Sequence, residues 1–342
     1  MKVSSVFFTA LALGVALACG TQVADVPPEP SRPTAPDGGP TPADAATDMT
    51  AVDTGATDAT KDAPADARAD SGPDATTDAT TDGGADAGVL RPLVFSAMGD
   101  VPYTAADGPT LQAQIVQHNA LSPSRFMVHL GDIKSGSTPC VEATYRTVAS
   151  YLHALAVPTF VIPGDNEWND CADPDEAWGF WTRHFGRFES FWPAAPAVAR
   201  QAVRTENFAW MDSGVLLVGI NLVGGRVHSA PEWATRHAQN VTWITDQLAL
   251  HGAAAYAMVL FAHADPTASH NAFMVPYRAA VGAWGKPVLH LMGDGHTWKM
   301  DRPWPEQNIL RVEVEQGGRA QPIQVTVTPL TPDPFTIART PY

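Results

Sequence analysis

Four Gly-Asp steps are the part of this sequence best placed to do chemistry, because each follows a short apolar run typical of a buried strand. They are Gly99-Asp100, Gly131-Asp132, Gly164-Asp165 and Gly293-Asp294. One such step alone is usually a turn, since glycine tolerates positive φ and aspartate hydrogen-bonds nearby backbone. Four at equivalent positions predict that the aspartates meet at the carboxyl ends of strands, where open α/β sheets bind ligands.

Two histidines extend this pattern. His263 comes two residues after the apolar run that ends at Phe261, and His296 lies two residues after Asp294. Carboxylate oxygens and imidazole nitrogens that converge on one rim suit two divalent cations, with one carboxylate between them. The sequence therefore predicts a metal site built from Asp100, Asp132, Asp165, His263, Asp294 and His296.

The elements that must position these residues alternate between β-rich apolar runs and amphipathic stretches, which is typical of a layered α/β domain over 91–342. We expect strands at 93–98, 126–130, 159–162, 215–220, 256–261, 288–292, 309–314 and 323–328. We expect helices at 110–120, 141–155, 174–186, 233–250 and 270–283, with Pro or Gly near most ends.

The N-terminal residues read as an export signal. Residues 1–18 combine Lys2 with a short apolar run and small residues, which predicts a signal peptide. The sequence Leu17-Ala18-Cys19-Gly20 resembles a bacterial lipobox, in which Cys19 is acylated, whereas ordinary cleavage before Cys19 and an uncleaved anchor are the alternatives. We expect an outer-membrane or cell-surface lipoprotein, and otherwise a periplasmic or secreted protein.

Residues 19–90 form a predicted disordered tether. The segment is nearly all Ala, Asp, Thr, Pro and Gly, and it has no aromatic residue, so it cannot bury a core. Over 21–90, 14 acidic and 3 basic side chains carry −11 of the chain's formal charge of −15. This acidic balance excludes a nucleic-acid-binding surface, which needs clustered Lys and Arg. Membrane contact is expected only through the lipid, and the protein is expected to be a monomer.

The ordered set of motifs resembles the calcineurin-like metallophosphoesterases, which include the purple acid phosphatases. That family has Asp-x-His, Gly-Asp, Gly-Asn-His-Asp/Glu, a His after a strand, and Gly-His-x-His. The matching segments, within 93–300, are Gly99-Asp100, Gly131-Asp132, Gly164-Asp165-Asn166-Glu167, Phe261-Ala262-His263 and Gly293-Asp294-Gly295-His296. The resemblance implies a four-layer sandwich of two mixed β-sheets flanked by helices, and we expect 301–342 to complete the second sheet.

The resemblance also implies roles for the six residues. Asp100 and His296 would hold one metal, Asp132 would bridge, and the second metal would lie on the remaining residues Asp165, His263 and Asp294. A bridging hydroxide would then attack the phosphorus of a phosphomonoester or phosphodiester substrate in line.

Several positions depart from the family pattern. Pro102 stands where the first motif has a His and offers no donor atom, and Tyr103 beside it could serve instead as a phenolate ligand or as a packed loop aromatic. Asp165 and Asp294 replace a neutral Asn and His of the family. Their added charge favours hard cations such as Mn²⁺, Mg²⁺ or Ca²⁺ over a histidine-rich zinc site, with iron and zinc still open.

Asn166 stands where the family has the His that assists the leaving group. An amide donates a hydrogen bond but cannot act as a general acid, and losing such a group costs on the order of 10²–10⁴ in rate. His228, His237 and His270 could compensate, although each also suits a surface position. Lys134, two residues after Asp132, could meet a substrate phosphate or offset the carboxylates, or be a solvated loop lysine.

Cys140 and Cys171 follow Asp132 and Asp165 by eight and six residues, so both lie on loops that leave the proposed rim. Disulfides persist in exported proteins, and with Cys19 lipidated these two cysteines form the remaining pair. We therefore predict a Cys140–Cys171 disulfide that joins the two ligand loops.

The predicted function is a metal-dependent phosphoester hydrolase with two divalent metal ions. The alternative is a degenerate, metal-stabilised surface lipoprotein that kept the fold and lost turnover with Asn166 and Pro102.

Overall fold

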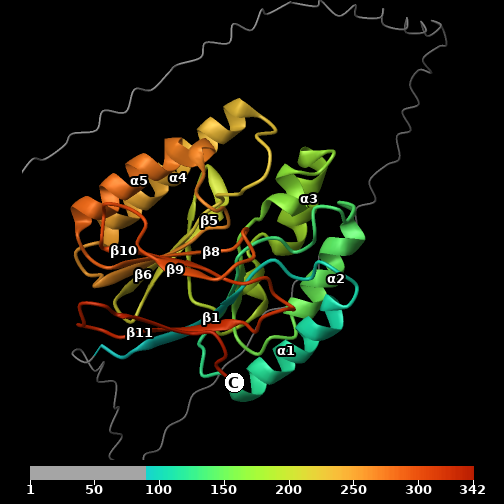
Figure 1. The fold of residues 1–342 in the computed structure, drawn as a ribbon, viewed down its shortest axis with the longest axis horizontal. Coiled ribbons are helices and arrows are strands. Elements are labelled where there is room, and N and C mark those ends of the chain that lie inside the picture. The colour runs from blue at the N-terminus through green and yellow to red at the C-terminus, as the bar shows by residue number, and fades with distance from the viewer. Residues whose placement is uncertain (1–89) are drawn as a thin grey trace, which may run out of the picture. The chain divides into compact units, whose positions relative to one another are not determined.

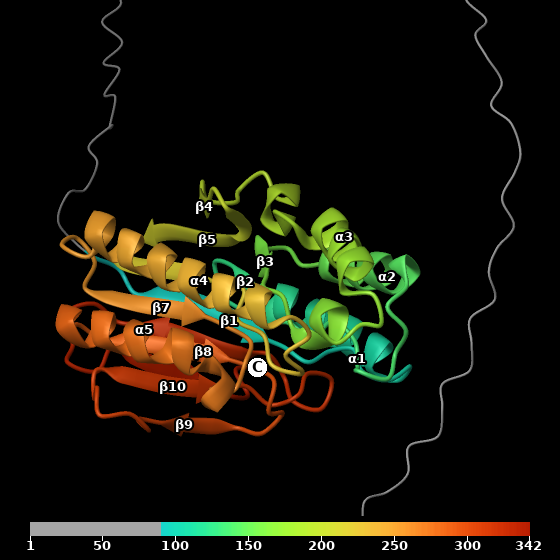
Figure 2. The ribbon, with the colours of Figure 1, turned by 90° about the horizontal axis from the view of Figure 1, so that it is seen from above.

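A computed structural model describes residues 90–342. The predicted signal peptide, the lipidation of Cys19 and the tether up to residue 89 lie outside the described residues. The described part has two mixed β-sheets, with strand orders β12-β11-β1-β2-β3 and β4-β5-β6-β7-β8-β10-β9. Figures 1 and 2 show the two sheets stacked, with α4 and α5 on one side of the pair and α1, α2 and α3 on the other. The predicted α/β sandwich of two sheets flanked by helices is confirmed.

The five-stranded sheet is built from strands at both ends of the described chain. Its strands are β1 (Leu93–Met98), β2 (Met127–His129), β3 (Thr159–Val161), β11 (Ile323–Val327) and β12 (Phe335–Ala338). Strands β1, β2 and β3 run parallel, whereas β11 pairs antiparallel with β1 and β12 antiparallel with β11. The parallel strands therefore end at one shared edge.

The seven-stranded sheet has a parallel centre and antiparallel edges. Its strands are β4 (Ala199–Gln201), β5 (Arg204–Asp212), β6 (Val215–Gly219), β7 (Ala257–Phe261), β8 (Val288–Met292), β9 (Lys299–Asp301) and β10 (Ile309–Glu313). Strands β6, β7, β8 and β10 run parallel, and β5 and β9 pair antiparallel with the outer members of this group.

The helices pack on the outer faces of the sheets. They are α1 (Asp107–Leu121), α2 (Glu142–Leu152), α3 (Pro174–Phe185), α4 (Ala230–His251) and α5 (Asn271–Trp284), with short helices at Asp165–Asn169, Phe188–Phe191 and Ala268–His270. Alternate residues of β1 show the division of the layers, because Phe95 faces the other sheet whereas Met98 packs on the side of α1 and α2. A separate apolar layer joins α4 and α5 to the seven-stranded sheet. Three apolar layers thus hold four layers of elements together.

Every predicted strand and helix is present within a few residues of its predicted bounds, but the assignment of 301–342 is wrong in part. Strand β10 does join the seven-stranded sheet, whereas β11 and β12 return to the five-stranded sheet through pairs such as Leu93↔Val327. Alternating apolar residues indicate a half-buried strand without indicating its partner. The sequence analysis also missed β4, β5, β9 and β12, which are short or, in β5, begin with polar residues.

A histidine in the core, His290, is expected to make the free energy of unfolding depend on pH in the acid range. His290 on β8 is fully buried against Tyr277 and Trp304, and neither ring nitrogen has a hydrogen-bond partner among the described residues. Burial lowers the pKa of His290 to about 3, whereas an unfolded histidine titrates near 6.5. The unfolded chain therefore takes up this proton first as pH falls, and stability is lost between about pH 6.5 and 3.

We expect His290→Leu to lose less stability than the parent between pH 7 and 4, by up to about 1.4 kcal/mol per pH unit, because the variant has no buried imidazole to protonate. Urea unfolding across this pH range measures the difference. His251→Leu, at the end of α4, is the control and should keep the parent's dependence. Parallel curves for the parent and His290→Leu would contradict this reading.

Candidate metal centre

The structure gathers the predicted ligands at one edge of the sandwich. Asp100, Asp132 and Asp165 lie in the loops after β1, β2 and β3 of one sheet, and His263 and Asp294 lie after β7 and β8 of the other. Donor atoms of Asp100, Asp132 and His263 lie within 4.8 Å of one another, and so do those of Asp165, His263 and Asp294. The parallel strands of both sheets thus deliver carboxylates to one place, as their shared direction requires.

The backbone of these loops adopts left-handed conformations that L-residues rarely take. Asp100 and Asp132 both have φ of 58°, and Asp294 and His296 have φ of 74° and 60°. Such conformations cost free energy and persist only where the surrounding structure determines them, which is common at functional sites. Three of the four Gly-Asp steps, those at Asp100, Asp132 and Asp294, therefore turn the chain sharply enough to aim the carboxylate into the cluster.

His263 is the centre of one group of donors. Its Nδ1 lies 2.7 Å from the carbonyl oxygen of Leu130, so Nδ1–H donates and Nε2 faces the carboxylates. Nε2 lies 3.1 Å from Asp165 Oδ1, 3.4 Å from Asp132 Oδ1 and 4.0 Å from Asp294 Oδ1. A histidine whose second nitrogen donates to a carbonyl is oriented in the way that metal-ligating histidines usually are.

Tyr103 is the centre of the other group. Its hydroxyl donates to Asp132 Oδ2 and lies 3.3 Å from Asp100 Oδ1 and 3.2 Å from His296 Nε2. Asn166 Nδ2 donates to the same hydroxyl at 3.0 Å and also to Asp132. The two oxygens of Asp132 thus face different groups, Oδ1 toward His263 and Oδ2 toward Tyr103.

Charge in the cluster is poorly balanced without a cation. Asp100, Asp132 and Asp165 are at most 6% exposed. Burial, with the charges of neighbouring carboxylates, raises the pKa of Asp132 well above its usual range, and burial likewise raises that of Asp294. Burial opposes the charged form of His263 too, but Asp132 and the hydrogen bond to Asp165 hold its pKa well above the ordinary value. One imidazolium therefore offsets several carboxylates, and a bound cation would relieve the remaining repulsion.

Three further observations fit divalent cations. Within residues 90–342, the buried Oδ2 of Asp100 has no hydrogen-bond partner, although such atoms normally have one. The separations of 3.1–3.4 Å between donor atoms are close to the spacing of about 3 Å between adjacent ligands of an octahedral ion with bonds of about 2.1 Å. Glycines surround the cluster, and a Cβ on Gly293 would lie 2.7 Å from Asp100 Oδ2.

Glu167 is a supporting residue to which the sequence analysis gave no role. It is fully buried, and its Oε1 accepts hydrogen bonds from the backbone N–H of Gly164 at 2.5 Å and of Asp132 at 3.2 Å. Tyr145 on α2 donates to the carbonyl oxygen of Glu167 at 2.5 Å. Glu167 therefore ties two ligand loops together, and its place in the Gly-Asp-Asn-Glu motif was the available signal.

Four residues that were predicted to assist catalysis do not contact the carboxylates of the cluster through hydrogen bonds or ion pairs of the described residues. They are Lys134, His228, His237 and His270. Lys134 is buried, but its Nζ donates to the carbonyl oxygens of Ser135 and Thr138 at 3.2 and 2.8 Å. Among the ion pairs of the described residues, none joins Lys134 to a carboxylate. Its ammonium holds the loop after Asp132 in shape, a role that the spacing alone did not reveal.

The histidines proposed as substitutes for a general acid are engaged elsewhere. His228 Nδ1 lies 2.7 Å from Asn169 Oδ1, and His270 Nε2 donates to the carbonyl of Val223 at 2.9 Å. His237 is 2% exposed and packs against His270, so it is not a surface histidine, and burial lowers its pKa to about 4. We find these residues in supporting positions rather than among the carboxylates.

The predicted Cys140–Cys171 disulfide is present and closes a loop between residues 31 positions apart. It lies beside Asn166, whose carbonyl oxygen is 3.7 and 3.6 Å from the two sulfur atoms. The disulfide therefore joins the loop after Asp132 to the short helix Asp165–Asn169 that carries Asn166.

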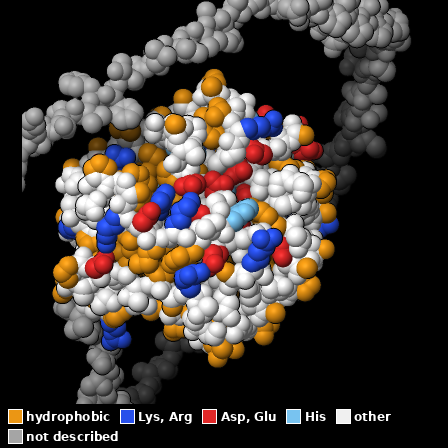
Figure 3. Space-filling model, in the orientation of Figure 1, with side chains coloured by type: hydrophobic (Ala, Val, Ile, Leu, Met, Phe, Trp, Pro, Cys, Tyr) orange, Lys and Arg blue, Asp and Glu red, His pale blue; other side chains and the backbone are white. Residues whose placement is uncertain are grey.

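A charged network that the sequence analysis missed borders the centre. Asp265 donates its backbone N–H to Asp294 Oδ2 at 2.9 Å, and its carboxylate pairs with Lys299 at 3.1 Å and Arg311 at 3.5 Å. Lys299 also pairs with the buried Glu313 at 2.5 Å. Figure 3 shows acidic and basic side chains side by side in the middle of this face, next to a histidine.

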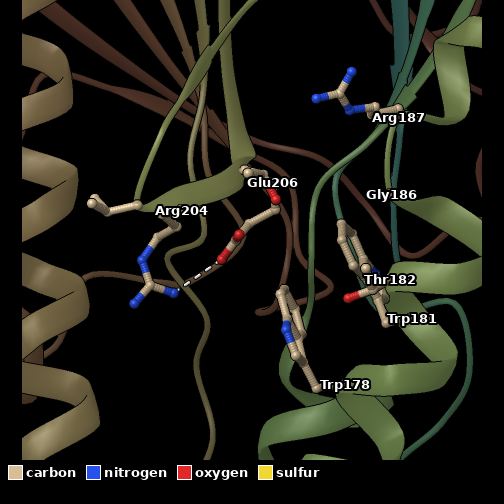
Figure 4. A pocket seen from close by; sticks show the side chains of 9 residues that line it. Trp178, Trp181, Thr182, Gly186, Arg187, Arg204 and Glu206 are labelled. Atoms are coloured by element: carbon tan, nitrogen blue, oxygen red, sulfur yellow. Dashed lines mark hydrogen bonds and ion pairs between the residues drawn. The ribbon is translucent and has the colours of Figure 1, made fainter.

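A cavity of about 480 Å³ lies apart from the carboxylates. Residues of α3 and β5 line it, among them Trp178, Trp181, Arg204 and Glu206, and the last two pair at 2.9 Å (Figure 4). It contains no member of the carboxylate and histidine cluster, so its size alone does not make it the site of chemistry.

Similarity to known proteins is found among solved structures and not among sequences. The sequence matches no protein-family model and no curated protein. Similar solved structures include GAP50, the anchor in the inner membrane complex of Plasmodium, at 9% identity over 73% of this chain and 88% of that one, with a TM-score of 0.46. TT1561 of Thermus thermophilus is 11% identical over 73% of this chain and 99% of that one, with a TM-score of 0.43. The 5'-nucleotidase from Candida albicans is 9% identical over 69% of this chain and 47% of that one, with a TM-score of 0.41. These likenesses are distant and assign no activity to this chain.

Within residues 90–342, no helix combines the length and apolar character that crossing a membrane requires.

Gly224 gives a direct test of the cluster's role. A Cβ at this position would lie 2.5 Å from Asp294 Oδ2 and 3.0 Å from Asp165 Oδ1. We expect Gly224→Ala to weaken Mn²⁺ binding at least about tenfold, as disturbance of ligand positions usually does, measured by titration calorimetry. Gly179→Ala in α3 is the matched control, because nothing lies within 4 Å of its added Cβ. Equal affinities in the two variants would contradict a metal centre at this place.

Proposed function

We propose that this chain is a metal-dependent phosphoester hydrolase of the calcineurin-like kind, acting on phosphomonoesters or phosphodiesters. The observation that carries the proposal is the convergence of two donor groups from the strand ends of both sheets, with Asp132 facing each group. Convergent carboxylates around a shared ligand are typical of centres that hold two divalent ions.

Each group supplies a set of ligands for one cation. Asp100, Tyr103 and His296 would hold the first, and Asp165, His263 and Asp294 the second, with Asp132 between them. Most of these donors are oxygen atoms, which favours Mn²⁺, Mg²⁺ or Ca²⁺ over a histidine-rich zinc site, while iron and zinc are the alternatives for measurement. When bound, two such ions supply Lewis acidity toward the phosphoryl oxygens and a nucleophilic water at neutral pH.

The chain's own residues add binding and orientation. Burial and the Asp132 and Asp100 carboxylates raise the pKa of Tyr103, so without a cation its hydroxyl stays protonated and donates to Asp132. Asn166 donates its two amide protons to the same hydroxyl and to Asp132, and an amide cannot protonate a leaving group. We therefore expect substrates whose leaving group departs without a general acid, such as aryl phosphates.

One observation favours a second candidate, a metal-binding surface protein without turnover. The amide of Asn166 and the hydroxyl of Tyr103 both donate to Asp132, so the chain satisfies this carboxylate with its own groups. A binding protein would retain the metal and show no hydrolysis, which distinguishes the two candidates.

We also propose export, because the Cys140–Cys171 disulfide is of the kind that persists outside the cytosol. A lipid on Cys19 would then anchor a monomeric hydrolase domain at a membrane surface, with the phosphoester as its only other partner.

The hydrolysis of 4-nitrophenyl phosphate and bis(4-nitrophenyl) phosphate by the full chain with Mn²⁺ tests the proposal. We expect Asp132→Asn to lower the rate at least about 100-fold, because it removes the carboxylate that both groups share. Asp246→Asn, an exposed position on α4, is the control and should match the parent. Bound metal with no hydrolysis by the parent would favour the binding protein instead.

A further inference from the structure

A pocket of about 380 Å³ lies beside the group of donors centred on Tyr103, and the proposed function assigns no role to it. Its walls come from the loop between β1 and α1, the loop after Asp132, and one face of α2. The volume is at the lower end of the range of about 300–1,000 Å³ that small-molecule sites occupy. It is therefore large enough for a group of one or two rings.

Tyr103 belongs to both the pocket and the cluster. Its side chain lines the pocket, while its hydroxyl contacts Asp100, Asp132, Asn166 and His296. If a molecule packs on this tyrosine inside the pocket, the end of the molecule that lies near the tyrosine hydroxyl is beside the carboxylates. The pocket is thus placed for the part of a substrate that is attached to the reacting group.

Apart from Lys134, the described residues that line the pocket are neutral. Tyr103 and Tyr151 contribute aromatic rings, and threonines contribute methyl and hydroxyl groups. The accessible apolar surface comes from Pro102, Ala105 and Ala143. Lys134 is buried, and two of its three ammonium protons are donated to backbone carbonyls. Among the described lining residues, a second anionic group on a substrate would therefore find no accessible cation, and a cationic group would find no carboxylate.

We propose that this pocket holds the alcohol part of the phosphoester and selects substrates in which that part is an uncharged aryl group of one or two rings. This inference rests on the proposed function, since the aryl compound is a substrate only if the chain is a hydrolase. Binding of the aryl group itself does not require turnover. Aromatic rings stack on tyrosine and bury the accessible apolar area of Pro102, Ala105 and Ala143, which is where the gain in affinity arises. An aryl oxygen is also a leaving group that departs without a general acid, as Asn166 requires.

Phenylphosphonate and methylphosphonate provide the test, because neither has a P–O–C bond to hydrolyse. With Mn²⁺ present, we expect the full chain to bind phenylphosphonate at least tenfold more tightly than methylphosphonate, measured by titration calorimetry. Thr147 lines the pocket from an exposed position of α2. Thr147→Trp fills the pocket and should reduce phenylphosphonate affinity to the methylphosphonate level.

Arg146→Trp is the matched control, because Arg146 is exposed on α2 and does not line the pocket. It should bind both phosphonates as the parent does, and thermal unfolding should show both variants folded. Equal affinity of the parent for the two phosphonates, or no effect of Thr147→Trp, would overturn the pocket's role. Selective phenylphosphonate binding without hydrolysis of any aryl phosphate would support the pocket and count against the hydrolase, so the two failures are distinct.

Discussion

Repulsion among buried carboxylates is the constraint on which the rest of this structure depends. Asp100, Asp132, Asp165 and Glu167 are almost fully enclosed, and Asp294 lies beside them, with His263 as the buried imidazole in their midst. Like charges within 4.8 Å of one another in a poorly hydrated place repel strongly, and protonation, hydrogen bonding or the binding of cations relieves this repulsion. The site is thus arranged at a cost in stability that a soluble domain would otherwise avoid.

The fold supplies the rigidity that such a site needs. Three apolar layers fix the strands of both sheets, so that the residues just beyond the parallel strands meet. Close backbone approach then requires glycine, since a Cβ on Gly131 would lie 2.6 Å from the backbone nitrogen of Gly164. Glu167 and the Cys140–Cys171 disulfide join the same loops from the other side. Packing, backbone conformation and cross-linking therefore act on one small volume.

The sequence predicted the strand ends well because Gly-Asp after an apolar run has a direct physical meaning. It could not predict which sheet β11 would join, because apolar alternation is the same for either partner. The sequence also could not predict the direction in which a long side chain points. Lys134 follows Asp132 by two residues, but its ammonium turns to the carbonyls of its own loop. Tyr103 was placed by analogy with a missing histidine, and its four contacts in the cluster became visible only in three dimensions.

The central claim is that the carboxylates and histidines of the two strand edges form a binding site for two cations. Metal analysis of the full chain after equilibrium dialysis against Mn²⁺ tests it most directly. The account predicts about two Mn²⁺ per chain, together with a rise in the unfolding temperature, because ligands that bind only the folded state stabilise it. A chain that retains no Mn²⁺, Mg²⁺, Ca²⁺, iron or zinc and unfolds at the same temperature with and without them would contradict the account.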